Sequence, residues 1–427
     1  MILLYKIFSS VLYPLLIIFF YLRKIKKKED PIRYKEKLFA SNFKVDRKFD
    51  SKLYWFHAAS IGEFKSILPI LKELINENKD IEFLITTTTL SSSILAKEKL
   101  SKIKNSRHRF LPIDTSFLTN KFIKLWKPNA IFFVDSEIWP NLILNAKQNK
   151  IPLALINARI TFRSFKRWSI FPNVAKKIFG AFNLSMCSNT ETQNFLNKLN
   201  VNNVHFKGNI KLIGEINENK FNEINENFLS KKRFWLAAST HKEEDVFCIR
   251  THINLKRKFS DIITIIAPRH INRANEIQAL CEKFNLKSQV LNKNENMSGK
   301  CEIIIINYFG DLQNYYKYAK SVFVGKSITK KLKNEGGQSP IEAAKLNCKI
   351  YHGPYVYNFN EIYEILKKLG ISNKINDDIE LSKYLIEDLK NPVKESNEIS
   401  KIMKDLADKT LTDTMRLINN FLQNENK

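Results

Sequence analysis

The chain is poor in glycine and proline, with 11 and 12 of them in 427 residues. This scarcity excludes long flexible linkers and collagen-like architectures. A hydrophobic fraction of 44% and a charged fraction of 26% are ordinary for globular proteins, and they exclude a largely disordered chain. The mean hydropathy of -0.29 excludes a membrane protein with many spans. At about 150 residues per domain, the length allows two or three domains.

Cysteine is also scarce, and recognisable metal-binding patterns are missing. The five cysteines are scattered, and none belongs to a C-x-x-C pair. Disulfide frameworks and structural zinc sites need closer spacing, so the pattern favours a reducing compartment such as the cytoplasm. The seven histidines are equally dispersed, and we expect no metal and no cofactor. The lack of G-x-G-x-x-G and P-loop motifs disfavours a nicotinamide dehydrogenase or a P-loop ATPase.

Acidic residues are few relative to basic ones, 43 against 70, which gives a formal net charge of +27. Such an excess implies an anionic partner: nucleic acid, a phospholipid surface or a phosphorylated substrate. A general bias toward lysine and asparagine is the slightly preferred explanation when the charge is considered alone. The charge by itself therefore names no function.

Residues 1–22 form a long apolar run whose only charge is Lys6, and a basic cluster follows at 23–28. A secretory signal would carry its positive charges before the run. At about 1.5 Å per residue, 22 residues span roughly 33 Å, enough for a hydrocarbon core of about 30 Å. Pro14 leaves a shallow or kinked insertion open. We expect a membrane-anchoring helix in 1–28, with the rest of the chain on the cytoplasmic side.

Ten short apolar runs alternate with helical patterns along the rest of the chain, five on each side of a polar stretch at 208–232. The runs lie at 53–58, 81–87, 130–134, 152–156, 184–187, 234–238, 262–267, 303–306, 321–324 and 349–351. Continuous apolar runs are typical of strands buried on both faces of a parallel sheet. The pattern predicts two Rossmann-like α/β domains at 29–207 and 208–427, facing across a cleft. The segment 399–422, in the second domain, is expected to form an amphipathic helix or a pair of helices.

Acidic residues follow two strands of the first predicted domain. Ser60 and Glu63 have the spacing of a capping box, yet Glu63 also lies at the carboxyl end of the first strand, where this fold places active sites. Both interpretations hold only if the carboxylate can turn into the cleft. Asp135 and Glu137 follow the third predicted strand. Trp139, two residues later, is expected to make a core or interdomain contact.

The second predicted domain carries candidate anion-binding residues. Arg269 and His270 follow a strongly apolar strand, where they suit a phosphate or carboxylate, although a solvated loop is an equal alternative. Gly336 and Gly337 lead into a helical run whose free backbone N–H groups suit a nucleotide phosphate. Glu342 could bond ribose hydroxyls or complement the helix dipole.

These residues belong to motifs that resemble those of the 3-deoxy-D-manno-octulosonic acid (Kdo) transferases of Gram-negative lipopolysaccharide assembly. They occur in the family's order over nearly the whole chain: H-A-x-S-x-G-E at 57–63, E-I-W-P-N at 137–141, N-A-R at 157–159 with R-S at 163–164, G-N-x-K at 208–211, S-T-H at 239–241, A-P-R-H at 267–270, G-G-x-x-P-x-E-A-A at 336–344 and G-P-x-x-x-N-F at 353–359. Lys326 stands where the family has glycine, and Gln338 and Ser339 replace its His-Asn pair.

The resemblance implies a membrane-associated inverting glycosyltransferase of the GT-B fold. It would move Kdo from CMP-Kdo to a phosphorylated lipid A precursor at the cytoplasmic side of the inner membrane, among anionic lipids, without a catalytic metal. Glu63 would be the general base and Glu137 a second essential acid. The implied donor-binding residues are Lys211, His241, Arg269, His270, Gly336, Gly337, Glu342 and Asn358, and the implied acceptor-binding residues are Ser60 and Arg159.

Two other functions stay open at the level of the sequence. One is a GT-B transferase that uses another nucleotide sugar on a lipid acceptor. The other, from a different class, is a membrane-tethered basic protein that binds nucleic acid. No zinc finger or RNA-binding signature supports the latter, and we expect no nucleic-acid partner.

Overall fold

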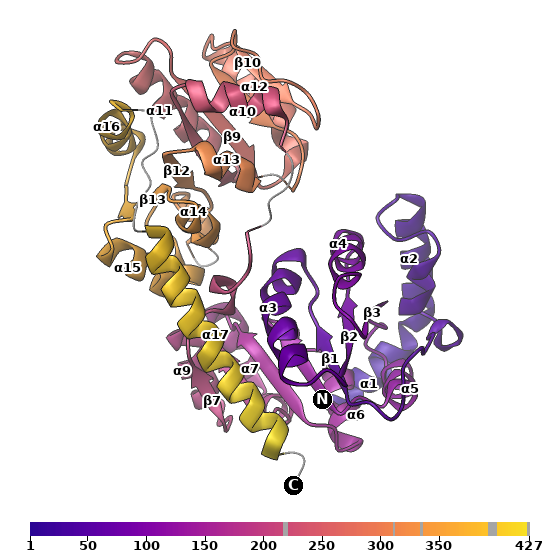
Figure 1. Cartoon of the computed structure of the whole chain (residues 1–427). Helices are drawn as coiled ribbons and strands as arrows, with labels where there is room; N and C mark the ends of the chain where they lie inside the picture. The colour runs from indigo at the N-terminus through magenta and orange to yellow at the C-terminus, as the bar shows by residue number, and fades with distance from the viewer. Residues whose placement is uncertain (217–220, 311, 334–335, 392–398, 425–427) are drawn as a thin grey trace. The chain divides into compact units, whose positions relative to one another are not determined.

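The computed structural model describes residues 1–216, 221–310, 312–333, 336–391 and 399–424 (Figure 1). The chain divides into two compact units, Met1–Glu215 with Ala407–Lys427, and Ile216–Leu406. Each unit is built on its own parallel sheet. The prediction of two Rossmann-like α/β domains is therefore confirmed.

Unit 1 contains a seven-stranded parallel sheet with the order β3-β2-β1-β4-β5-β6-β7. The order reverses between β1 and β4, where ligands bind in folds of this type. Tyr54 of β1 pairs with Phe83 on one side and Ala130 on the other. The strands are β1 Leu53–His57, β2 Glu82–Thr87, β3 Ser106–Phe110, β4 Ala130–Val134, β5 Leu153–Ala158, β6 Leu184–Cys187 and β7 Val204–Phe206.

Successive strand residues point to opposite sides of the sheet, so these continuously apolar strands make both faces apolar. Helices cover both faces. Trp55 belongs to one hydrophobic cluster and Phe56 to the other. Besides two helices at the N-terminus, the helices of the unit are α3 Ile61–Glu77, α4 Leu90–Leu100, α5 Ser116–Trp126, α6 Pro140–Gln148, α7 Phe162–Ile170, α8 Pro172–Phe179 and α9 Thr190–Lys198, with 3-10 turns at Arg33–Lys37, Ala40–Asn42 and Ile210–Leu212.

Unit 2 repeats the architecture, with the strand order β10-β11-β9-β8-β12-β13-β14. Its strands are β8 Phe234–Thr240, β9 Ile263–Pro268, β10 Ser288–Leu291, β11 Ile303–Ile306, β12 Ser321–Val324, β13 Lys349–His352 and β14 Ser372–Lys374. Its helices are α10 Glu223–Lys231, α11 Glu244–Lys256, α12 Ala274–Lys283, α13 Leu312–Tyr318, α14 Ile341–Lys345, α15 Asn360–Lys368 and α16 Asp378–Leu389, with 3-10 turns at Ile271–Arg273, Lys330–Leu332 and Tyr357–Phe359.

The last helix, α17 Ile399–Asn424, differs from the expectation that it belongs to the second domain. Its C-terminal half returns to unit 1, where Met415, Ile418 and Phe421 join the core and the Phe421 ring lies 5.6 Å from that of Phe132 (Figure 1). The unit boundary at Glu215 also leaves Lys211 in unit 1. An amphipathic pattern indicates that a helix packs, but it does not say on which sheet.

The N-terminal apolar run forms two helices, α1 Ile2–Val11 and α2 Tyr13–Ile25, bent by 54°. Pro14 falls in the first turn of α2, where its missing N–H and fixed φ are tolerated. Among the described residues, no single helix is long and apolar enough to span a membrane, although this bent pair meets the length and composition criteria jointly.

Candidate functional site

Glu63 lies in the first turn of α3, directly after the carboxyl end of β1. Its Oε2 accepts hydrogen bonds from the backbone N–H of Ala59 (2.7 Å) and of Ser60 (3.4 Å), and the Ser60 hydroxyl donates to Oε1 (2.8 Å). The Ser60 side chain in turn accepts from the Glu63 N–H. The capping box expected from the spacing is thus present, and it holds the carboxylate at the carboxyl edge of the sheet.

Glu137 lies after β4, the neighbour of β1, and contacts two aromatic side chains. Its Oε2 lies 3.2 Å from Nε2 of the buried His57 and accepts a 2.9 Å hydrogen bond from the indole N–H of Trp139. Trp139, for which the sequence predicts a core or interdomain contact, packs against the core of unit 1, and its indole N–H also faces this carboxylate.

Asp135, also after β4, is the buried centre of an ion cluster. Its Oδ1 pairs with Nε of Arg159 (3.0 Å) and its Oδ2 with Nζ of Lys211 (2.8 Å). Burial alone would raise the pKa of Asp135, but the two cations prevail and hold that pKa at about 2. Lys211, expected on the donor side in the second domain, thus lies beside the unit 1 carboxylates.

The three carboxylates affect one another. Burial is the main cause that raises the pKa of Glu63, and the nearby charges of Asp135 and Glu137 raise it further. The hydrogen bonds of Glu63 act in the opposite direction. A carboxylate whose pKa is raised toward neutrality is a better general base than an ordinary one, provided that it is still ionised. Unit 1 thus places a candidate base at the point where the strand order reverses.

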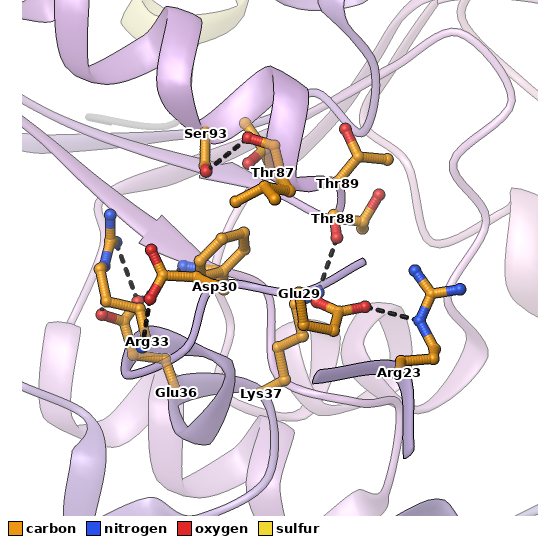
Figure 2. Close-up of polar contacts among 12 residues, drawn as sticks. Arg23, Glu29, Asp30, Arg33, Glu36, Lys37, Thr87, Thr88, Thr89 and Ser93 are labelled. Carbon is orange, nitrogen blue, oxygen red and sulfur yellow. Dashed lines mark hydrogen bonds and ion pairs between the residues drawn. The ribbon is translucent and has the colours of Figure 1, made fainter. Parts of the chain in front are cut away.

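The segment after α2 is bound to the same edge of the sheet. Figure 2 shows Glu29 between Arg23 (2.7 Å) and Lys37 (2.5 Å), with the Lys37 ammonium also donating to the carbonyl of Thr88 (2.8 Å). The Thr88 hydroxyl donates to the carbonyl of Ala59, the residue whose N–H binds Glu63. Burial lowers the pKa of Lys37, in opposition to its pairing with Glu29.

Unit 2 gathers basic side chains at the carboxyl ends of β8 and β9. His241 follows β8, and Arg269 and His270 follow β9 in exposed positions, with the two imidazole rings 5.7 Å apart. Burial is the main cause that lowers the pKa of His241 to about 4, and the nearby charge of Lys326 contributes. Within the described part of the chain, Nε2 of His241 and Nη1 of Arg273 are buried without a hydrogen-bond partner. This edge suits an anion.

Glu244, in the first turn of α11, organises the loop after β12. Its two carboxylate oxygens accept backbone N–H bonds from His241, Lys326, Ser327 and Ile328, between 2.7 and 3.2 Å. Lys326 has a left-handed φ of 61°. The glycine that the related motif carries at this position would adopt that conformation without steric cost.

The Gly-Gly loop packs against the segment after β13. A Cβ on Gly336 would come within 2.1 Å of the Tyr355 carbonyl oxygen, and Gly337 has a φ of 94°. The Asn358 N–H donates to the Gly336 carbonyl (3.2 Å). The following helix, α14, is only five residues long, and Oε1 of Glu342 accepts from the Gln313 amide (2.7 Å).

The expected site residues thus form two groups. Ser60, Glu63, Glu137, Arg159 and Lys211 lie on unit 1, and the remaining donor candidates lie on unit 2. Sequence reasoning did not single out Thr86, Glu244 or Arg273, and it gave no separate role to His57. Their position at the carboxyl ends of strands, or at the start of the next helix, is the signal that could have identified them.

Comparison with known proteins gives a consistent result. The sequence model of the family described as 3-Deoxy-D-manno-octulosonic-acid transferase (kdotransferase) matches residues 33–213. A 3-deoxy-D-manno-octulosonic acid transferase of Rickettsia typhi is 30% identical over 399 residues, which cover 83% of this chain and 84% of the relative. A protein of the same name from Rickettsia bellii is 29% identical over 390 residues, 90% of each chain.

A solved structure supports the fold class. The crystal structure of UDP-GlcNAc 2-epimerase from Neisseria meningitidis bound to UDP-GlcNAc has a TM-score of 0.55 to this chain at 13% identity, covering 88% of this chain and all of the other. At this identity the likeness concerns the fold alone. Together with the two parallel sheets, it confirms the expected GT-B class.

Proposed function

The chain belongs to the 3-deoxy-D-manno-octulosonic acid (Kdo) transferases, a family of glycosyltransferases, and on this premise we propose that it moves Kdo from CMP-Kdo to a phosphorylated lipid A precursor. The observation that carries the proposal is the pair of carboxylates, Glu63 and Glu137, at the carboxyl ends of β1 and β4. Transfer to a hydroxyl needs a base at the acceptor and a binding site for the departing phosphate.

In the proposed reaction, the Glu63 carboxylate turns out of its capping box and takes the proton of the acceptor hydroxyl. The acceptor oxygen bonds to the anomeric carbon of Kdo as the bond from that carbon to the phosphate oxygen breaks, and CMP leaves with the bonding electrons. Inversion of the anomeric centre follows from a single displacement. Glu137 would accept a hydrogen bond from substrate, while Ser60 and Arg159 would contact the acceptor.

Unit 2 would hold the donor. His241 and His270 offer hydrogen-bond donors, and Arg269 adds positive charge. Buried nitrogens of His241 and Arg273 have no hydrogen-bond partner among the described residues, which supports an anion at this edge. Gly336, Gly337, Glu342 and Asn358 would complete the nucleotide site, with the backbone of the Gly-Gly loop near the nucleotide and Glu342 near the ribose. Lys211, paired with Asp135, would act from unit 1.

We also propose that the chain attaches to the cytoplasmic face of the inner membrane. Tyr5 and Ser9 fix α1 to unit 1 through Asp114 (2.9 Å) and Asn141 (3.1 Å). The helix pair also exposes large apolar side chains, among them Leu4, Phe8, Leu15, Ile18 and Ile25. Exposed apolar side chains on two successive helices, followed by basic residues, suit helices that lie in a lipid interface.

Helix α7 supplies a further surface of this kind. Its exposed positions include the apolar Phe162 and Ile170, one at each end of the helix, and between them the cationic Arg163, Lys166 and Arg167. This combination suits anionic lipid head groups and the phosphates of the acceptor.

Product mass tests the proposed reaction directly. The full chain is incubated with CMP-Kdo and a bis-phosphorylated lipid A precursor in mixed vesicles. We expect a lipid product heavier by one or more Kdo residues, with one CMP released for each. Parallel reactions with UDP-sugars should give no product. Transfer from a UDP-sugar without transfer from CMP-Kdo would contradict the proposal and favour the other GT-B hypothesis.

Vesicle binding tests the attachment. The full chain should cosediment with vesicles that contain anionic lipid, and L4D/F8D should weaken binding by about tenfold or more because both aspartates would enter the lipid interface. Ile94 is equally exposed but lies on α4, so Ile94→Asp is the matched control and should bind as the wild type does. Equal binding of all three proteins would contradict the assignment of α1.

A further inference from the structure

A chain of hydrogen bonds inside unit 1 leads from the core to Glu137. Trp55, Thr86 and His57 are fully buried, on neighbouring strands β1 and β2. The indole Nε1 of Trp55 lies 2.8 Å from the Thr86 hydroxyl, which lies 3.0 Å from Nδ1 of His57. On the other side of the ring, Nε2 of His57 lies 3.2 Å from Oε2 of Glu137.

In one arrangement of the hydrogens, every contact along the chain pairs a donor with an acceptor. An indole N–H can only donate, so the Thr86 oxygen accepts from Trp55 and its own hydrogen can be directed to Nδ1 of His57. With Nδ1 accepting, Nε2 carries the hydrogen and donates it to Glu137. The opposite tautomer would donate from Nδ1 to the Thr86 carbonyl oxygen (3.2 Å) and accept the Trp139 indole N–H at Nε2 (3.1 Å). It would also leave an unprotonated Nε2 and a carboxylate oxygen, two acceptors, 3.2 Å apart.

The indole Nε1 of Trp139 lies 2.9 Å from the same carboxylate oxygen and 3.1 Å from Nε2 of His57. When Nε2 carries a hydrogen, the indole N–H donates to the carboxylate. Oε2 of Glu137 thus has two donors, whereas Oε1 has no hydrogen-bond partner among the residues that the structure describes. The side chain of Glu137 is 19% exposed, and that of His57 is not exposed at all. Two donors on one oxygen fix the plane of the carboxylate and leave the other oxygen available to a ligand.

We propose that His57 is a positioning residue: with Trp139 it clamps Oε2 of Glu137 and presents Oε1 to the substrate. The assignment rests on the proposed function, since it takes Glu137 as a residue that contacts substrate. His57 itself acts only through Glu137. Thr86 extends the chain by fixing the His57 tautomer, and Trp55 fixes the Thr86 hydroxyl.

Two amide variants separate positioning from packing. In His57→Gln the side-chain NH₂ can occupy the place of Nε2 and still donate to Glu137, whereas in His57→Asn it reaches only the place of Nδ1. We expect His57→Gln to keep kcat within about fivefold of the wild type and His57→Asn to lower kcat by about 10- to 100-fold, as losses of supporting hydrogen bonds do, with the KM for CMP-Kdo unchanged. Equal losses in both variants would overturn the proposal.

Combination with Glu137→Gln supplies the decisive control. If His57 acts through Glu137, His57→Asn should cost little further activity in the Glu137→Gln background, and additive losses would overturn the proposal. Should His57→Asn fail to fold, Thr86→Val and Thr86→Ser test the hydrogen bond on the other side of the His57 ring. Serine keeps the hydroxyl and valine removes it, so only the valine variant should lose activity.

The wild type, His57→Asn, Glu137→Gln and the double variant are also unfolded in urea without substrate. If the losses in unfolding free energy are not additive, His57 and Glu137 interact, and this result does not depend on which reaction the protein catalyses. Additive losses would overturn the clamp. A wild type that transfers no Kdo would instead contradict the proposed function. Full activity of Glu137→Gln would contradict the role of Glu137 and, with it, the positioning role.

Discussion

Several residues with a left-handed backbone lie where strands end. Asp135 (φ 61°) follows β4, Ser239 (φ 57°) lies near the end of β8, and Lys326 (φ 61°) follows β12. Such conformations cost side chains other than glycine about 1–3 kcal/mol and persist where the surroundings enforce them. Here the ion pairs of Asp135 and the Glu244 contacts around Lys326 do so. The strained positions coincide with the polar edges proposed to bind substrate.

Lys326 offers a test of this strain. Lys326→Gly should raise the free energy of unfolding by about 1 kcal/mol relative to Lys326→Ala, because both variants lose the charge but only glycine accepts the left-handed φ freely. Urea unfolding of the two variants measures the difference. Identical unfolding midpoints would show that the left-handed backbone carries no cost here.

At the scale of single residues, the sequence identified candidates but could not pair them. Glu63 and Glu137 could be predicted because each follows an apolar run. The contact between His57 and Glu137 joins residues 80 positions apart and exists because β1 and β4 are neighbours in the sheet. Strand order is not encoded in the local pattern, so neither this contact nor the Asp135–Lys211 pair could be derived.

Among the elements, the ten predicted runs all form strands, and the four unpredicted strands are the edges of the two sheets. These are β3, β7, β10 and β14. Edge strands are less buried, so their sequences need not be continuously apolar. For example, β3 has the sequence SRHRF, with intermediate exposure at three positions. Continuous apolar runs therefore identify the buried central strands of a parallel sheet but not its edge strands.

The N-terminal segment should be part of unit 1 rather than a dispensable tether. The Glu29 and Lys37 side chains are almost fully buried against each other (Figure 2). Glu29→Gln would leave the ammonium of Lys37 without its charge partner, and we expect a loss of about 3–5 kcal/mol in unfolding free energy. In E29Q/K37M, which removes both charges, most of that loss should disappear. Urea unfolding checks both, and an unchanged stability of Glu29→Gln would refute the account.

Helix α17 should stabilise unit 1 and not unit 2. Ile418 is fully buried in the unit 1 core, so Ile418→Ala should cost about 2–5 kcal/mol. Hydrogen exchange resolved by segment should show faster exchange in β1 and β4, with β8 and β9 unaffected. Lys404→Ala, an exposed position on the same helix, serves as the control. Faster exchange confined to unit 2 would contradict the assignment.

For the whole molecule, the candidate site residues are divided between two units. The carboxylates lie at the carboxyl edge of the unit 1 sheet. The basic side chains, with nitrogens that have no hydrogen-bond partner in the described part of the chain, lie at the corresponding edge of unit 2. The net charge of +27 named no partner by itself. The structure places part of that charge on the exposed face of α7 and part at the end of β9.

The central claim is that Glu63 is the base of the transfer, and the rate of Kdo transfer by Glu63→Gln tests it most directly. Glutamine preserves the capping box, so the fold should be intact, but its amide cannot take a proton. At saturating CMP-Kdo we expect a loss of at least about 10²-fold, with CMP affinity within about twofold of the wild type. Since the pKa of Glu63 is raised, wild-type activity should increase with pH as Glu63 ionises. Retained turnover by Glu63→Gln, with the wild-type pH profile, would contradict the claim.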